Sequence, residues 1–224
     1  MISPGHRRRL NRAMHELRRP LQALVLLDEP PGDPGQPAKR GAESARRGLL
    51  ELARSALASL DAEVNGASPL PARREVSCRE LVHAALERWR PLAVAAGGVR
   101  LYWDAGAAPA VCDPMRLAQA LDNLLANAVE HGGAPIVVTG ARVAGRLRVT
   151  VANGPGGGAL STGSEWERAS RNDGGRDPRR GHGVELVTEV AGEHRGRFAL
   201  CRTGSGCVAA LEVPLTHGGL AQAA

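Results

Sequence analysis

Two long stretches with helical periodicity stand near the start of the chain, separated by a stretch that excludes a helix. Residues 6–27 and 41–64 both repeat apolar side chains at spacings of three and four residues, the pattern of a helix that packs on partner helices. The sequence between them, "DEPPGDPGQP" (28–37), contains four prolines, each of which removes a backbone donor and clashes with a preceding helical turn. Two long helices joined by such a connection predict an antiparallel hairpin over residues 1–64.

The apolar stripes of the two helices are too wide to cover each other within one hairpin. The stripes consist of Leu10, Met14, Leu17, Leu21 and Leu24 in the first helix, and of Leu50, Ala53, Leu57, Leu60 and Val64, broadened by Leu49 and Leu52, in the second. We therefore expect a homodimer in which two hairpins form a four-helix bundle.

A histidine and a glutamate stand side by side on the first of these helices. His15 follows Met14 by one position, which puts it on the flank of the apolar stripe and within reach of solvent. Pro20 is expected to bend the helix just past the histidine. An accessible imidazole beside the Glu16 carboxylate suits a nucleophile. The alternative is a surface His-Glu pair on an ordinary helix, and this stretch alone leaves both interpretations open.

Composition narrows the function classes. The formal net charge is +6, but the arginines are scattered and aromatic residues make up only 2% of the chain, which disfavours nucleic-acid binding by base stacking. The cysteines at 78, 112, 201 and 207 form no CxxC pair and no zinc-ligand spacing, so we expect reduced thiols. No apolar run approaches the roughly 18 residues that span a membrane, and no signal peptide is visible. We expect a cytoplasmic protein without a membrane span.

The second part of the chain mixes helices and strands. Residues 65–75 are a linker by their Gly, Pro and Ser content, residues 76–215 form the mixed region, and residues 216–224 are a tail. Helices are predicted at 78–95, 114–131 and 183–194, and strands at 99–103, 135–142, 146–152, 197–202 and 207–213. The stretch between Gly154 and Arg180 is rich in Gly, Ser, Arg and Asp and predicts a long loop, which in a compact domain is usually functional. The whole chain is therefore predicted to be α+β.

The predicted helix over 114–131 has one apolar and one polar face. The polar face consists of Arg116, Gln119, Asn123, Asn127 and Glu130. Two asparagines four residues apart offer carbonyl oxygens to a hard cation such as Mg²⁺, which keeps several waters and bridges to phosphates. A solvated surface face is the alternative.

Two glycine-containing segments complete the pattern. Gly181 and Gly183 open a predicted helix directly after the long loop, which suits backbone donors that hold a phosphate at a helix N-terminus. A predicted strand runs into a Gly-Pro turn in "RVTVANGPGGG" (148–158). Each of these signals is weak alone.

Taken in this order, the segments resemble the core of a bacterial two-component sensor histidine kinase. The sequence "HELRRPL" (15–21) is similar to the family's H box, "DNLLANAVEH" (122–131) to the N box, "VANGPGG" (151–157) to the G1 box and "RRGHGVEL" (179–186) to the G2 box. The resemblance covers roughly residues 7–215. It implies a HisKA-type dimerisation and phosphoacceptor hairpin, followed by a GHKL-type ATP-binding α/β sandwich with a mixed sheet and helices on one face.

The resemblance also implies roles for individual residues. His15 would accept the phosphoryl group, Glu16 would be its acid-base partner, and Asn127 would bind Mg²⁺. Residues 157–180 would be the ATP lid. The residues implied to bind ATP are Asn123, Asn127, His131, Asn153, Gly154, Gly156, Gly181, His182 and Gly183. The implied activity is an ATP-dependent protein-histidine kinase that passes the phosphoryl group to a response-regulator receiver domain, with input from a separate sensor chain or a region outside this sequence.

The chain departs from the family pattern at several positions. The G1 aspartate that reads adenine is replaced by Asn153, or by Ala152 in the other alignment, and Glu185 replaces the third G2 glycine. Glu130 stands where a lysine often follows the N box, and Arg19 stands where bifunctional members carry Thr or Asn. These departures predict weakened ATP binding. They leave open a pseudokinase or histidine phosphotransfer protein, while the complete H box disfavours a serine kinase of the anti-sigma type.

Overall fold

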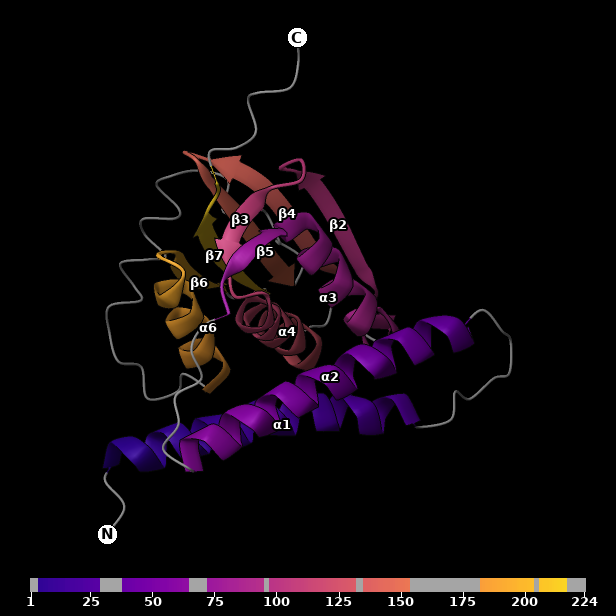
Figure 1. Cartoon of the computed structure of the whole chain (residues 1–224). Coiled ribbons are helices and arrows are strands. Elements are labelled where there is room, and N and C mark those ends of the chain that lie inside the picture. The colour runs from indigo at the N-terminus through magenta and orange to yellow at the C-terminus, as the bar shows by residue number, and fades with distance from the viewer. Residues whose placement is uncertain are drawn as a thin grey trace.

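The computed structural model describes residues 4–28, 38–64, 72–94, 97–131, 135–153, 182–203 and 206–216. Helices α1 (Pro4–Asp28) and α2 (Ala38–Val64) run antiparallel beside each other (Figure 1). Helices α3 (Cys78–Ala93), α4 (Pro114–His131) and α6 (His182–Glu193) lie between this hairpin and a sheet. The predicted antiparallel pairing of the first two helices is therefore present, and α1 continues as a helix through Pro20.

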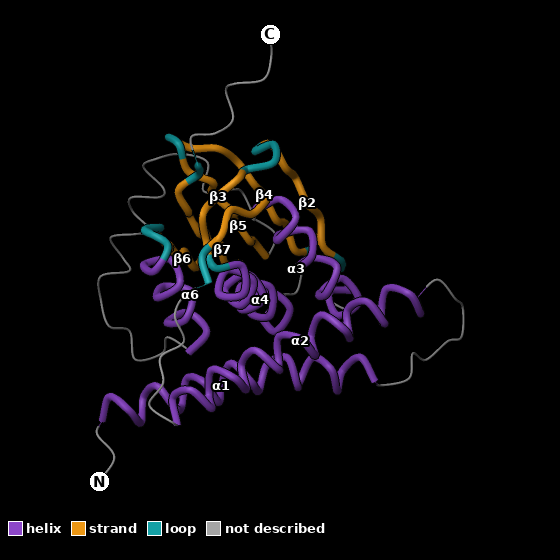
Figure 2. Tube along the Cα trace, viewed as in Figure 1, coloured by secondary structure: helices purple, strands orange, loops and turns teal. Residues whose placement is uncertain are grey.

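The main sheet has five strands in the order β2-β4-β5-β7-β6 (Figure 2). The strands are β2 (Val99–Asp104), β4 (Ile136–Val143), β5 (Arg146–Asn153), β6 (Arg197–Thr203) and β7 (Gly206–Pro214). The β2–β4 pair is parallel, and the remaining neighbours are antiparallel. A mixed sheet covered by helices on one face agrees with the sequence prediction.

A second, two-stranded sheet was absent from the prediction. Strands β1 (Arg74–Ser77) and β3 (Pro109–Cys112) pair antiparallel, and β1 begins inside the segment predicted to be a linker. Strands of four residues are too short to show an alternating pattern, and β1 opens with two charged residues. Their pairing depends on a partner far along the chain, which local sequence does not report.

The core lies between the main sheet and the three helices. Strands β5 and β7 present alternate apolar residues to it, among them Val149 and Leu211, which face each other across the two strands. On β4, Gly140 lies opposite Trp103 of β2, and a Cβ atom at this glycine would come within 2.2 Å of the indole ring. The glycine therefore makes room for the tryptophan.

The hairpin buries one side against the helices of the domain and exposes the other. Leu49 and Leu52 of α2 lie in the same apolar core as Trp89 of α3, and Leu49 is fully buried. The exposed large apolar side chains of the hairpin are Met14, Leu21, Val25, Leu50, Leu57 and Val64. The predicted stripe of α2 is thus divided. Leu49 and Leu52, which were expected only to broaden it, pack against the domain, whereas Leu50, Leu57 and Val64 are exposed. Within the described part of the chain, no helix has the length and apolar character needed to cross a membrane.

Candidate functional site

The start of α4 is fixed by a local cap and by one long-range hydrogen bond. Asp113 caps the helix, because its Oδ1 accepts the backbone N–H groups of Met115 at 3.0 Å and Arg116 at 3.2 Å. Its own backbone N–H donates to Nε2 of buried His194 at 2.9 Å, so the ring proton lies on Nδ1, which donates to the carbonyl of Val190 at 2.7 Å. A neutral imidazole therefore ties the beginning of α4 to the end of α6.

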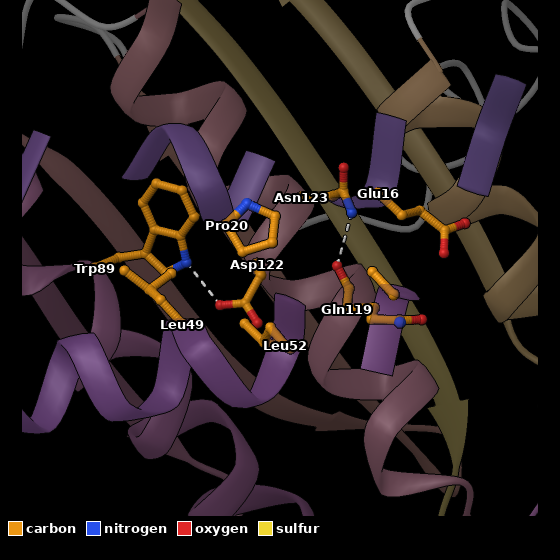
Figure 3. A pocket seen from close by; sticks show the side chains of 9 residues that line it. Glu16, Pro20, Leu49, Leu52, Trp89, Gln119, Asp122 and Asn123 are labelled. Atoms are coloured by element: carbon orange, nitrogen blue, oxygen red, sulfur yellow. Dashed lines mark hydrogen bonds between the residues drawn. The ribbon is translucent and has the colours of Figure 1, made fainter. Parts of the chain in front are cut away.

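The polar face of α4 turns toward the hairpin at Asn123. This side chain is 6% exposed, and its Nδ2 donates to the backbone carbonyl of Gln119 at 2.9 Å. Both residues line a small pocket between the hairpin and the domain (Figure 3). The pocket holds about 20 Å³, room for a single water, and is lined by Glu16, Pro20, Leu49, Leu52, Ala56, Trp89, Gln119, Asp122 and Asn123.

Asn127 lies one helical turn beyond Asn123 and is half-buried rather than buried. Among the described residues, no group of three His, Cys, Asp or Glu side chains could hold a metal ion. A site built on the Asn127 carbonyl, with phosphate and water oxygens as the other ligands, fits the hard-oxygen chemistry of Mg²⁺. Of the two asparagines, Asn127 is the one with access to such a ligand.

Asp122, which precedes Asn123 in α4, joins this helix to α3. It accepts hydrogen bonds from Trp89 Nε1 at 2.6 Å and from Arg88 Nη2 at 2.8 Å, which join α4 to α3. Burial raises the pKa of the Asp122 carboxyl above its ordinary value, while the charge and hydrogen bond of Arg88 and the hydrogen bond of Trp89 oppose the rise. This carboxylate faces α3 and belongs to the packing of the domain.

Glu16 of α1 reaches the same region from the hairpin. Its side chain is 8% exposed, and Oε2 lies 4.0 Å from Nη1 of Arg116 on α4. His15 lies beside it in α1, and its side chain is outside the described ones. The structure therefore brings the predicted H-box segment and the predicted N-box helix together.

Arg116 joins three helices. It makes two hydrogen bonds to Glu193 of α6, Nη2–Oε1 at 2.9 Å and Nε–Oε2 at 3.1 Å, and lies 3.4 Å from Glu189. Burial disfavours its charge, but the hydrogen bond and charge of Glu193, together with the charge of Glu16, outweigh burial and raise the pKa of Arg116. Sequence analysis placed Arg116 on the polar face of α4, but no sequence signal links it to α1 or α6.

Asn153 ends β5 with both halves of its amide engaged. Its Oδ1 accepts the backbone N–H of Cys207 at 3.1 Å, and its Nδ2 donates to the carbonyl of Ala128 at 3.3 Å. The side chain is 5% exposed and bridges α4 to β7. A further hydrogen bond from adenine would use the second lone pair of the same oxygen.

The remaining predicted site residues fall into three groups. Gly183 is buried in the first turn of α6, as expected for a glycine at a helix start. His131 and His182 lie in α4 and α6, but their side chains are outside the described ones. Gly154, Gly156, Gly181 and the predicted lid over 157–180 lie outside the described residues. One signal was overlooked, since Asp113 followed by Pro114 is the usual start of a helix.

Comparisons with known proteins agree with this architecture. The histidine kinase AdeS of Acinetobacter baumannii is 17% identical, with a TM-score of 0.52 over 92% of this chain and 96% of that one. A histidine kinase from Burkholderia phymatum is 21% identical, with a TM-score of 0.50 over 96% of this chain and all of that one. Full-length ShkA, solved in complex with AMPPNP, is 22% identical, with a TM-score of 0.52 over 96% of this chain and 46% of that one.

At the sequence level, no curated protein gives a significant match to this chain. Residues 112–217 match the family described as histidine kinase-, DNA gyrase B-, and HSP90-like ATPase. This segment begins at the end of β3 and contains α4, α6 and strands β4 to β7. The chain thus shares its fold with solved histidine kinases, and residues 112–217 match the family model of histidine kinase-, DNA gyrase B-, and HSP90-like ATPases.

Proposed function

We propose that the protein is an ATP-dependent protein-histidine kinase. In the first step the bond between the terminal phosphorus and the bridging oxygen of ATP breaks, a P–N bond forms to the imidazole of His15, and ADP leaves. In the second step an aspartate of a response-regulator receiver domain takes the phosphoryl group as an acyl phosphate, and His15 is regenerated.

One observation carries this proposal beyond the family match. Glu16, the residue next to His15, is buried against α4, the helix that bears both Asn123 and Asn127. Phosphoryl transfer depends chiefly on positioning and charge neutralisation. A histidine on this part of α1 therefore stands close to the helix proposed to face the nucleotide.

Each part of the site has a role in the proposal. Glu16 holds the imidazole of His15 in the tautomer that exposes a nitrogen lone pair. Asn127 holds Mg²⁺, which supplies charge neutralisation at the phosphates when bound. Gly183 lies in the first turn of α6, where backbone N–H groups face outward to a phosphate. The AMPPNP complex of the similar ShkA structure supports a nucleotide substrate.

The hairpin supports a dimer. Its exposed apolar side chains recur at seven-residue intervals on both helices, at Met14 and Leu21 of α1 and at Leu50, Leu57 and Val64 of α2. This is the spacing of a helix seam that seeks further helices. A second copy of the hairpin completes the four-helix bundle.

A second candidate is a pseudokinase that relays phosphate through His15 without binding ATP. The engaged amide of Asn153 favours it, because a neutral side chain with two internal partners replaces the charged aspartate of the family pattern. Loss of a charge-assisted hydrogen bond costs about 1.5–3 kcal/mol, or about ten- to a hundredfold in affinity.

Incubation of the purified protein with labelled Mg-ATP tests the proposal. We expect label that is stable in base and lost in acid, as for phosphohistidine, and its loss in His15→Ala. The matched control is His83→Ala, because His83 is an exposed histidine on α3. Label that survives His15→Ala would contradict the assignment. No nucleotide binding in calorimetry, with phosphotransfer from a phosphorylated regulator to His15 intact, would establish the relay instead.

A further inference from the structure

A cluster of one guanidinium and three carboxylates lies where α1, α4 and α6 meet. Arg116 stands at its centre, with Glu193 at 2.9 Å, Glu189 at 3.4 Å and Glu16 at 4.0 Å. The first two carboxylates belong to α6 and the third to the hairpin. The arginine side chain is 22% exposed, so solvent screens these interactions only in part.

The charges of this cluster make hairpin docking depend on Arg116. The Glu16 side chain is 8% exposed, and a carboxylate buried to this degree is costly unless a cation compensates it. Without Arg116, the carboxylate of Glu16 would face those of Glu189 and Glu193 with their compensating charge removed. Like charges repel, so the loss of the guanidinium weakens the contact of α1 with α4 and α6.

The position of the guanidinium is set by the domain. Glu193 binds it through two hydrogen bonds, and Gln119 accepts a third from Nη1 at 3.2 Å. These contacts hold the guanidinium on the domain, whereas its contact with Glu16 is longer, at 4.0 Å. Arg116 is therefore a preorganised receptor on the domain for a carboxylate on the hairpin.

We propose that Arg116 is a positioning residue that sets where Glu16, and with it His15, lies relative to α4. The inference rests on the proposed function. Arg116 acts through Glu16 and touches no reacting atom. A displacement of about 1 Å in a reacting group lowers a rate by up to about a hundredfold, so a loosened hairpin slows phosphoryl transfer without weakening ATP binding.

The kinetic test compares Arg116→Gln with the wild-type chain in phosphorylation of His15 at varied Mg-ATP. We expect kcat to fall about ten- to a hundredfold, with KM for ATP unchanged. Arg116→Lys keeps one charge and should recover part of the rate. Glu193→Gln loosens the guanidinium without touching the hairpin, and it should lower kcat less than Arg116→Gln does.

The matched control is Arg90→Gln. Arg90 forms an ion pair with Glu87 at 2.9 Å, the same distance as between Arg116 and Glu193, but on the exposed surface of α3. We expect wild-type kcat from this variant. An unchanged kcat in Arg116→Gln, or an equal loss in both variants, would overturn the proposal.

A second readout does not depend on activity. Hydrogen exchange of the full chain should show faster exchange in α1 of Arg116→Gln, with protection of α3, α4, α6 and the sheet retained. Loss of protection in α4 or α6 instead would make Arg116 a structural residue of the domain and overturn the positioning role. If the wild-type protein is not phosphorylated at all, the proposed kinase activity fails, and the exchange of α1 still decides whether Arg116 holds the hairpin.

Discussion

Arg148 and Glu212 face each other across β5 and β7 as a buried ion pair. The Nη2 and Nε atoms of the arginine lie 2.8 and 2.9 Å from Oε1 of the glutamate, and the two side chains are 9% and 4% exposed. The pair lies on the face of the sheet turned away from α3, α4 and α6, because alternate residues of β5 face the core. Each charge offsets part of the cost of burying the other.

Removal of one partner from this pair should be more damaging than removal of both. We expect Glu212→Leu to cost about 3–5 kcal/mol in the free energy of unfolding, because it leaves the arginine buried without its counter-charge. Arg148→Leu combined with Glu212→Leu should recover most of that loss. Urea unfolding of both single variants and the double variant measures this. A double variant as unstable as the sum of the single ones would show that the two charges act independently.

Gly140 should tolerate no side chain. Gly140→Ala places a Cβ atom within 2.2 Å of the Trp103 ring, whose Nε1 is held by the carbonyl of Gly106 at 2.6 Å. We expect a loss of about 1–3 kcal/mol from this overpacking. Gly192→Ala is the matched control, since a Cβ atom there meets nothing within 4 Å, and alanine in a helix should stabilise by about 0.5–1 kcal/mol. Thermal unfolding distinguishes the two, and equal effects would contradict the contact with Trp103.

Asn127→Ala should lower the phosphorylation rate more than Asn123→Ala. Asn127 is the partly accessible residue proposed to bind Mg²⁺, and loss of that ligand is worth several kcal/mol of barrier. Asn123 is buried beneath the hairpin, and its amide donates to the carbonyl of Gln119. Initial rates at varied Mg²⁺ concentration test this, and only Asn127→Ala should shift the Mg²⁺ dependence. Equal and mild effects would show that the polar face of α4 is merely solvated.

Asn153→Asp should tighten nucleotide binding and destabilise the fold at the same time. The substitution supplies the charge that the family pattern has at this position, and its oxygen can still accept from the backbone N–H of Cys207. It loses the hydrogen bond to the carbonyl of Ala128, which costs about 1–3 kcal/mol. Asn153→Ala should weaken both binding and stability. Calorimetry with Mg-nucleotide and urea unfolding measure the two effects, and an affinity unaffected by either substitution would favour the relay.

The exposed face of the hairpin should hold two copies together. Met14 and Leu57 are 60% and 54% exposed, and lysine at both positions puts charge in the expected seam. We expect the wild-type chain to sediment as a dimer and Met14→Lys with Leu57→Lys as a folded monomer. Val111→Lys is the control, because Val111 is equally exposed but lies on β3, away from the hairpin. A wild-type monomer at all concentrations would contradict the dimer.

The long elements could be predicted from the sequence, since each carries its own periodicity. The helix expected at 114–131 is α4 with the same bounds, and the strand expected at 146–152 is β5 with one more residue. Strands β1 and β3 could not be predicted, because four residues give no pattern. The side of the hairpin that packs against the domain was also missed, since the stripes of α1 and α2 do not reveal that Leu49 packs against Trp89 of α3 rather than against a second copy of the hairpin.

For the site, sequence patterns indicated which residues to examine but not what they contact. The N-box spacing identified Asn123 and Asn127 together, and the structure separates them into a buried and a partly accessible residue. The internal partners of Asn153 come from residues 25 and 54 positions away, Ala128 and Cys207. Such contacts follow from the closed fold, and a local pattern does not encode them.

The parallel pairing of β2 with β4 gives α4 a second significance. Parallel neighbours need a crossover connection, and here that connection consists of β3 and α4. The pairing of β2 with β4 closes this long connection, and its closure carries an entropic cost that slows folding. The helix that bears Asn123 and Asn127 is therefore part of the connection between two paired strands. We expect it to unfold together with the sheet. Local fraying would then leave the face proposed to bind nucleotide intact, while loss of that face would accompany global unfolding.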